Sequence, residues 1–436
     1  MRILVISAEV WRDDTNGGNV LSNIFGDMEA EFAQIYCNPG MPSNHLCKRY
    51  YQMTDASVLR NLLKKEPVGK CFVLEDEKTK EGHSEIQIQQ IKGYSAFKAI
   101  RLPLFFVLQE LMWLVSDWKS KELKQFVEEF APDVIFAPCY ASQRMLAMVR
   151  HIKKLTNKPI ISYISDDNYS LRQFHISPVY WLNRFVLRHD MRKTFPDYDL
   201  VYTMTEEQKK EYEEAFGVNM KILRKSGVPK ATLLRYPHQP IRLIYAGGIY
   251  CGRVKTLCKI VQALRVINQN ELKMQLHIYT GGTMTKKQQR LLNDQKNSFV
   301  HSLISLEALR EKYEQSDIAL HIEAFGLKNR LLTRLSFSTK IVDCLASGCA
   351  VLAIAWKEHS GLKYLKRENA AICVDDLRYV LPCLLELTKK EELIYEWRER
   401  AQNCLIKNHD RKEISQSVKR DFINVCKGQK YENCTN

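Results

Sequence analysis

Residues 243–255 read LIYAGGIYCGRVK. An apolar run that ends in two glycines, Gly247 and Gly248, is typical of a buried strand followed by a tight turn and a helix. Glycine lets the backbone amides of such a turn approach a ligand, and the start of the following helix favours an anion. Arg253 and Lys255 add two cations where a diphosphate would lie. The stretch indicates a phosphate site, although an ordinary strand–helix turn with surface cations has the same pattern.

The same strand–turn–helix pattern occurs on both sides of this stretch. Short apolar runs alternate with helical periodicity, which is typical of parallel sheets covered by helices. We expect strands at 3–7, 133–137, 159–164, 200–203, 241–246, 275–279, 318–322 and 350–354, with helices such as 119–130, 141–155 and 256–268 between them. Residues 225–240, KSGVPKATLLRYPHQP, are rich in proline and predict a linker.

This alternation predicts an α/β fold of two tandem Rossmann-like domains that face each other across a cleft. At 436 residues the chain is long enough for two cores of roughly 200 residues each. We place the first domain at residues 1–230 and the second at residues 241–408. A helix at about 410–428 is expected to pack back on the first domain.

A second informative stretch, residues 336–351, reads SFSTKIVDCLASGCAV. Lys340 is expected in the first turn of a helix, where a lysine opposes the helix dipole and therefore indicates a nearby anion. Asp343 lies three residues further on, and so on nearly the same face. A lysine for phosphate beside a carboxylate for ribose hydroxyls is one interpretation. A local ion pair on a solvated helix is the other.

Carboxylates also follow two of the predicted strands. Asp166 and Asp167 come directly after the strand at 159–164, at the edge where open parallel sheets bind ligands. They can orient or deprotonate a hydroxyl, or they can cap the next helix. Glu323 ends the strand that contains His321 and can supply a further carboxylate. His321 itself is as consistent with core packing as with ligand contact.

Composition limits the class of partner. The chain carries a formal net charge of +15, and its 45% apolar content is typical of a folded globular protein. Such an excess of basic residues attracts phosphate-bearing substrates or an anionic membrane surface. The basic residues are scattered and accompany no zinc-finger or RNA-binding signature, so we expect no nucleic acid.

Cysteine usage and one long apolar run bear on location. The 13 cysteines have no regular spacing, and no secretory signal is recognisable, which predicts a reduced, cytoplasmic protein. The run at 102–115, LPLFFVLQELMWLV, is too short to span a bilayer. It predicts either a buried helix or an interfacial one. The latter would dip Phe105, Phe106, Trp113 and Trp118 into lipid, peripherally, at the inner face of the plasma membrane.

The stretches 243–255 and 336–351 resemble the bacterial glycosyltransferases of the glycosyltransferase-B fold, family 4 or group 1-like, which assemble capsule and lipopolysaccharide. Their C-terminal domain carries a strand, a glycine turn and an Arg/Lys pair, and later Lys-x-x-(Glu/Asp)-x-Leu-Ala-x-Gly-x-x-Val. This chain has the latter as Lys340, Asp343, Leu345, Ala346, Gly348 and Val351. The family usually has glutamate in place of Asp343, and often another eight positions earlier, where this chain has Leu335.

The resemblance implies transfer of a sugar from a nucleotide diphosphate sugar to a hydroxyl of a saccharide acceptor. The acceptor would be lipid-linked, as in cell-surface polysaccharide synthesis. Transfer would retain the anomeric configuration and need no metal or other cofactor, the nucleotide sugar being a co-substrate. Residues 1–230 would bind the acceptor, and residues 241–408 the nucleotide sugar.

The resemblance also assigns roles to individual residues. Arg253 and Lys255 would meet the donor diphosphate, and Asp343 the ribose. The loop of Gly17 and Gly18 would face the donor phosphates or the acceptor. Two other functions fit the same fold. One is a sugar-nucleotide 2-epimerase, which needs no acceptor, and the other is a non-catalytic nucleotide-sugar-binding subunit of a polysaccharide assembly complex.

Overall fold

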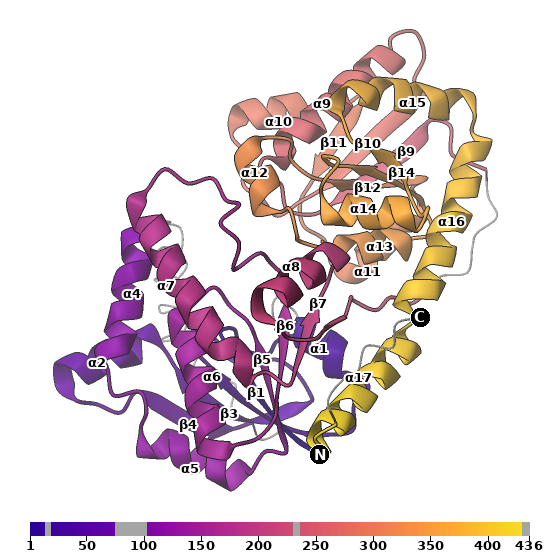
Figure 1. Cartoon of the computed structure of the whole chain (residues 1–436). Helices are drawn as coiled ribbons and strands as arrows, with labels where there is room; N and C mark the ends of the chain where they lie inside the picture. Colours follow the sequence, from indigo (N-terminus) through magenta and orange to yellow (C-terminus); the bar gives the residue numbers. More distant parts are fainter. Residues whose placement is uncertain (14–18, 75–102, 230–235, 430–436) are drawn as a thin grey trace.

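The computed structural model of the chain describes residues 1–13, 19–74, 103–229 and 236–429. Within this part, strands form two separate sheets, and helices cover both of them (Figure 1). Neighbouring strands in each sheet are parallel, with one exception described below. The predicted α/β fold of two tandem Rossmann-like domains is confirmed.

The first sheet contains eight strands among the described residues, in the order β4-β3-β2-β1-β5-β6-β7-β8. They are β1 (Arg2–Ser7), β2 (Glu31–Tyr36), β3 (Cys47–Met53), β4 (Gly69–Val73), β5 (Val134–Pro138), β6 (Ile160–Ile164), β7 (Leu200–Thr203) and β8 (Met220–Ile222). The pair β3–β4 is antiparallel. The central strands β1, β5 and β6 are almost wholly buried, because both faces of the sheet are covered and their sequences are continuously apolar.

Five helices of this half begin where a serine or threonine side chain caps them. The described helices of this half are α1 (Asn19–Phe25), α2 (Asp55–Lys64), α4 (Pro103–Val115), α5 (Lys121–Phe130), α6 (Gln143–Thr156), α7 (Pro178–Thr194) and α8 (Glu206–Phe216), and a 3-10 turn, Phe195–Asp197, follows α7. The hydroxyl of Ser142 accepts from the amide of Met145 at α6, and that of Thr205 accepts from the amide of Gln208 at α8. These caps fix the helix starts at the carboxyl edge of the sheet.

The second sheet contains six parallel strands within the described part of the chain, in the order β11-β10-β9-β12-β13-β14. They are β9 (Ile241–Ala246), β10 (Met274–Tyr279), β11 (Ser298–His301), β12 (Ile318–Ile322), β13 (Ala350–Ile354) and β14 (Ile372–Val374). Its helices are α9 (Arg253–Ile267), α10 (Lys286–Leu292), α11 (Leu306–Glu314), α12 (Leu327–Leu332), α13 (Lys340–Leu345), α14 (Ser360–Arg367) and α15 (Val380–Lys389), with a 3-10 turn at Leu377–Tyr379. β9 and β12 lie side by side, so their carboxyl ends meet.

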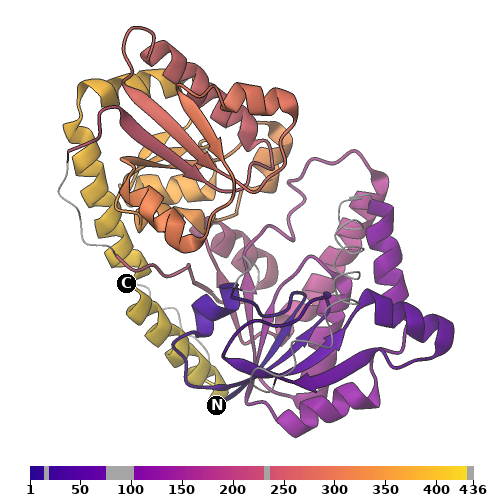
Figure 2. The same cartoon turned by 180° about the vertical axis from the view of Figure 1, so that it is seen from behind.

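Two long helices run along one side of the molecule and connect the two halves (Figures 1 and 2). α16 (Glu392–His409) packs against β13 and α13, whereas α17 (Arg411–Cys426) packs against α1 and β5. Phe422 of α17 contacts Phe25 and Phe136 with ring centroids 5.6 and 6.1 Å apart. Asp421 accepts a hydrogen bond from the hydroxyl of Tyr202 at 2.7 Å. The last helix therefore completes the core of the first half.

Residues 103–115 of the apolar run form α4. The two tryptophans that an interfacial helix would place in lipid are instead buried in the protein. Trp113 is buried and donates to Asp55 at 2.7 Å, and Trp118 is buried beside His151. Neither indole is available to dip into lipid, whereas Phe106 is exposed. Searching the described residues finds no helix that is long and apolar enough to cross a membrane.

Candidate active site

In the turn after β9, the side chain of Lys340 lies directly against the backbone of a glycine. Gly247 follows the strand, and a Cβ atom at this position would overlap Nζ of Lys340, the first residue of α13. The hydroxyl of Tyr245 donates to the carbonyl of Gly248 at 2.6 Å and holds the turn in place. Burial, together with the charge of Arg253, lowers the pKa of Lys340 to about 8. The ammonium is therefore poorly solvated and ready to accept an anionic partner.

Beside this lysine lies a buried ion pair. Arg253 begins α9, and its Nη2 and Nε atoms donate to the two carboxylate oxygens of Glu323 at 2.6 and 3.1 Å. Burial alone would raise the pKa of Glu323, but His359 and Arg253 lower it below its ordinary value. Burial disfavours the charge of Arg253, and the carboxylate of Glu323 outweighs this and raises its pKa. Both groups are thus charged.

Three polar atoms around the pair are buried and have no hydrogen-bond partner among the described residues. They are Nη1 of Arg253, Nε2 of His321 and Nδ1 of His359. The two imidazole rings lie 6.1 Å apart, and burial lowers the pKa of His321 to about 3 and also lowers the pKa of His359. Unpartnered buried polar groups are costly, so a polar ligand at this place would relieve a penalty.

Two predicted donor contacts are arranged differently from the expectation. Lys255 is exposed, whereas Arg253 is buried, because residues two apart on a helix point to different sides. The structure thus brings Arg253 together with Lys340 and Glu323 rather than with Lys255. Asp343 lies on α13, and its carboxylate pairs with Nζ of Lys225 at 2.6 Å. Neither member of this pair is buried, so a ligand can replace Lys225.

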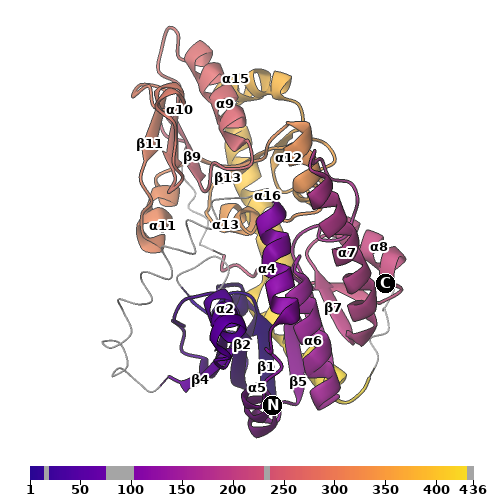
Figure 3. The ribbon, with the colours of Figure 1, turned by 90° about the vertical axis from the view of Figure 1, so that its left-hand side faces the viewer.

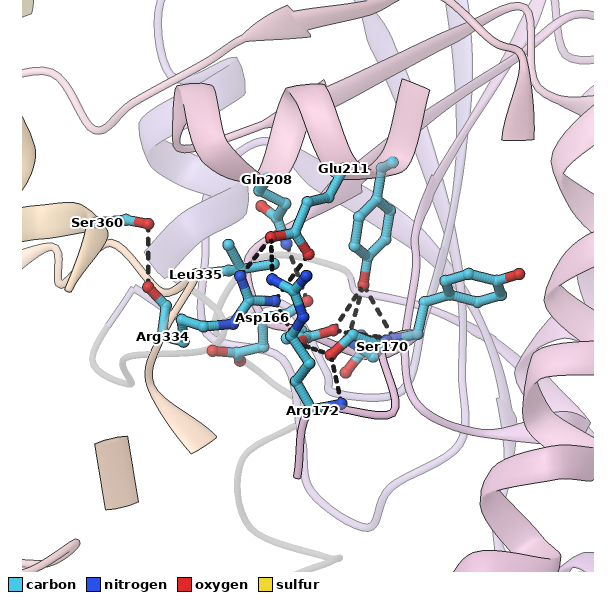
Figure 4. A network of polar contacts seen from close by, with 12 residues as sticks. Asp166, Ser170, Arg172, Gln208, Glu211, Arg334, Leu335 and Ser360 are labelled. Atoms are coloured by element: carbon cyan, nitrogen blue, oxygen red, sulfur yellow. Dashed lines mark hydrogen bonds and ion pairs between the residues drawn. The ribbon is translucent and has the colours of Figure 1, made fainter. Parts of the chain in front are cut away.

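The carboxylates after β6 have separate environments (Figure 4). Asp167 is buried and accepts from the amides of Tyr169 and Ser170 at 3.3 and 2.9 Å. Its oxygens also pair with Arg184 at 3.7 Å and with Arg334 at 3.4 Å. The buried side chain of Asp167 holds this loop, which favours the structural of the two interpretations of this residue. Asp166 is exposed.

Asp166 and Asp167 together form one wall of a contact between the two halves. Arg334 reaches across to Glu211 of α8, with Nη2 2.7 Å from a carboxylate oxygen, and the hydroxyl of Ser336 donates to Asp166 at 2.9 Å. Leu335 is fully buried and lies in the core of the first half, where its carbonyl accepts from the hydroxyl of Thr205 at 3.2 Å. The position at which the family that the sequence resembles often has a glutamate is thus an apolar anchor.

Sequence reasoning missed Arg334, Glu211 and His359, and did not identify Leu335 as an anchor. The only signal was the departure at Leu335 from the family pattern, because spacing along the chain does not reveal contacts between two domains. Gly17 and Gly18 lie outside the described residues. An open hollow of about 320 Å³ lies beside the Asp167 loop and is lined by Tyr169, Arg172, Arg188 and Glu211, among others. In the described ranges, no three His, Cys, Asp or Glu side chains gather closely enough to hold a metal ion.

Solved structures share the fold of this chain, although neither a protein-family model nor a curated protein sequence matches it. Sucrose-phosphate synthase from Thermosynechococcus elongatus aligns with 98% of this chain and 99% of its own, with a TM-score of 0.61 at 13% identity. HepE from Anabaena in complex with UDP aligns over 97% and 100%, with a TM-score of 0.60 at 12% identity.

A third structure is an α,α-trehalose-phosphate synthase (UDP-forming) from Burkholderia xenovorans in complex with glucose-6-phosphate. It aligns over 97% of this chain and 100% of its own, with a TM-score of 0.58 at 11% identity. Agreement over almost the whole of both chains defines the class of fold. The chain has the glycosyltransferase-B fold.

Proposed function

We propose that the chain is a glycosyltransferase that takes a nucleotide diphosphate sugar as donor and a saccharide hydroxyl as acceptor. The observation that carries this proposal is the ammonium of Lys340 over the bare backbone of Gly247, beside the buried Arg253–Glu323 pair. Negative charge grows on the diphosphate as the glycosidic bond breaks, and cations already aimed there lower the barrier. Complexes of similar folds with UDP support uridine among the donor bases.

Each residue of the donor end has a separate task in this proposal. Lys340 and Nη1 of Arg253 bind the diphosphate, and Glu323 keeps the guanidinium aligned. The neutral imidazoles of His321 and His359 offer hydrogen bonds to the sugar. Asp343 exchanges Lys225 for the ribose hydroxyls. Because Lys340 and Arg253 supply the positive charge that a cation would otherwise provide, we expect transfer without a metal.

The acceptor is proposed to enter from the carboxyl edge of the first sheet. Asp166 is the exposed carboxylate there and lies across from Ser336 of the second half, so it can orient a hydroxyl. We further propose that the acceptor is a lipid-linked saccharide of a cell-surface polysaccharide, and that the chain works beside the membrane. The sequence resemblance also leads us to expect retention of the anomeric configuration.

The donor site is tested with thermal shift in the presence of nucleotides, because a ligand raises stability only where it binds. UDP is expected to raise the melting temperature of the parent protein. Gly247→Ala should weaken UDP binding about tenfold, since the new methyl group displaces the Lys340 ammonium. Gly326→Ala is the matched control, because a Cβ there makes only an ordinary contact, 3.9 Å from Nδ2 of Asn329.

A further pair of variants isolates the charge. Lys340→Ala should abolish the shift with UDP, whereas Lys259→Ala, which removes an exposed lysine of α9, should retain it. Equal behaviour of the two lysine variants would refute the assignment. Incubation of the donor without acceptor then separates the proposed transfer from an epimerase, because only an epimerase would convert the donor sugar in its absence.

A further inference from the structure

In α4, polar side chains face the protein and several apolar side chains face outward, the opposite of an ordinary surface helix. Its polar residues face the protein, where Gln109 donates to Asp55 at 2.6 Å and Glu110 accepts from the hydroxyl of Ser142 at 2.8 Å. Trp113 is buried in the core, but five apolar residues of the helix face outward. The exposed side chains are Phe106, Leu108, Leu111, Leu114 and Val115, and Leu114 is 77% exposed. Three of them, Leu108, Leu111 and Val115, follow the i, i+3, i+7 spacing of one helix face.

The neighbouring helix α7 continues this apolar surface. α7 packs against α4 and α6, and Figure 3 shows α4 and α7 on the same side of the first half. Leu182, Phe185 and Val186 of α7 are exposed at i, i+3 and i+4 spacing. Ile176, just before the helix, is 91% exposed. We call these side chains and those of α4 the α4–α7 face.

The α4–α7 face gathers nine exposed apolar side chains on and beside two helices that pack together. Single exposed apolar residues are normal on soluble proteins, but contiguous apolar patches mark interaction sites. Toward the end of α7 the exposed side chains are basic instead, at Arg192 and Lys193. An apolar area bordered by cations on the same helix matches a bilayer with an anionic surface, because acyl chains take the apolar side chains and headgroups take the cations.

Two alternatives fit the face less well. A second copy of this chain would bring the same basic residues close to one another in a molecule of net charge +15, which opposes association. A bilayer-spanning role is excluded for α4, because its 13 residues are too few to cross. A helix of this length can lie in the membrane plane with its apolar side immersed.

We propose that the α4–α7 face docks the protein on an anionic lipid surface. The loop from Ser165 to Ser177 links this face directly to Asp167 and the edge of the first sheet. Docking therefore holds the acceptor edge next to the membrane, where the acceptor of the proposed function is tethered. Only the link between docking and a tethered acceptor rests on the proposed function, since docking itself requires no sugar substrate.

The test is flotation of the full chain with vesicles of phosphatidylcholine, with and without phosphatidylglycerol. The parent should bind only the anionic vesicles, and salt should weaken binding. The triple variant Leu111→Ser, Leu114→Ser, Phe185→Ser should bind about tenfold or more weakly. Lys193→Gln should bind about fivefold more weakly. A matched control, Val266→Ser, Leu272→Ser, Tyr379→Ser, removes exposed apolar residues of the other half and should bind like the parent.

Several results would overturn the inference. Equal vesicle binding by the triple variant and its control would do so, as would failure of the parent to bind anionic vesicles. A dimer in light scattering that the triple variant dissolves, without any vesicle binding, would assign the face to a second copy. The shift with UDP is measured on the same variants without vesicles. Failure of the parent to dock, with its UDP shift retained, would reject this inference alone. Loss of the parent's UDP shift, with its docking retained, would reject the proposed function alone.

Discussion

Glu323 and Asp167 are both buried carboxylates near the carboxyl end of a parallel strand, and both pair with arginine, but their surroundings differ. Glu323 holds Arg253 and leaves Nη1 of that arginine without a partner among the described residues. Asp167 accepts from two amides of its own loop and pairs with Arg184 and Arg334. Glu323 thus positions a guanidinium that still has an N–H group to donate. The oxygens of Asp167 are all engaged by its own loop and by the two arginines.

The difference shows how to distinguish a ligand site from a structural cluster of the same composition. Unused hydrogen-bonding capacity in a buried place is a cost that a ligand can remove, whereas a saturated carboxylate gains nothing from one. Burial and charge are alike at the two places. The two places differ in which buried polar atoms remain without a hydrogen-bond partner. Mutation is therefore expected to reduce activity at the Glu323 site and stability at the Asp167 site.

The largest expected effect is a loss of stability on mutation of Asp167. Asp167→Ala leaves Arg184 without its buried carboxylate and weakens the contact with Arg334, so the free energy of unfolding should fall by about 3–5 kcal/mol in urea titration. Transfer activity per folded molecule should stay within about twofold. Asp166→Asn, at the exposed neighbour, should change stability by less than about 0.5 kcal/mol. A stable Asp167→Ala protein without activity would instead place Asp167 in the active site, as Glu323 is.

Next in size is the loss of turnover at the donor end. Arg253→Lys keeps a charge beside Glu323 and thus the fold, but it removes the two-pronged guanidinium and its free Nη1. Turnover of donor should fall by about 10²–10³-fold, the size found for a lost donor to a developing negative charge. The measurement is the rate of UDP release at saturating donor. Unchanged turnover would place Arg253 with Asp167 as a structural residue.

The pH dependence of nucleotide binding sharpens the comparison further. Lys340 carries its charge below a pKa of about 8, and bound phosphate raises that pKa. Affinity for UDP should therefore be constant below that pH and fall above it, reaching about tenfold weaker binding at pH 9 than at pH 7. Titration calorimetry at both values checks this. Lys340→Gln should bind weakly at both, and a persisting dependence in that variant would point to another group.

The smallest effect is expected at Asp343. Asn at this position keeps an acceptor oxygen for ribose but loses the charge that pairs with Lys225. Nucleotide affinity should weaken by about two- to tenfold, the size of one ordinary hydrogen bond. The KM for the acceptor should not change. An altered acceptor KM with intact nucleotide affinity would move Asp343 to the other side of the reaction.

The fold followed from the sequence because strands buried on both faces have continuous apolar runs that periodicity detects. The donor end was partly predictable for a related reason. Gly247, Arg253 and Lys340 occupy turns and helix starts next to β9, whose position is fixed by the fold. Which cation Arg253 accompanies was not predictable, since the side to which each residue of α9 points depends on where the helix begins.

The polar contacts of Arg334 and Ser336 with the first half escaped prediction. Arg334 meets Asp167 and Glu211 across a large sequence separation, and no local rule relates residues that only tertiary packing brings together. The sequence left the role of Asp167 open for the same reason, because its second arginine comes from the other half. Leu335 departs from the family pattern, and its burial in the first core explains the departure.

α17 also has a consequence for how the protein is made. The strands it covers end with β8 at Ile222, but the helix begins only at Arg411. A ribosome that adds about 5–20 residues per second would need on the order of ten seconds or more between the two. During that interval Phe25 and Phe136 lack the ring of Phe422, so the nascent first half exposes an unfinished core. The cell's chaperones would meet it in that state, and synthesis of α17, rather than synthesis of the first half, would complete its folding.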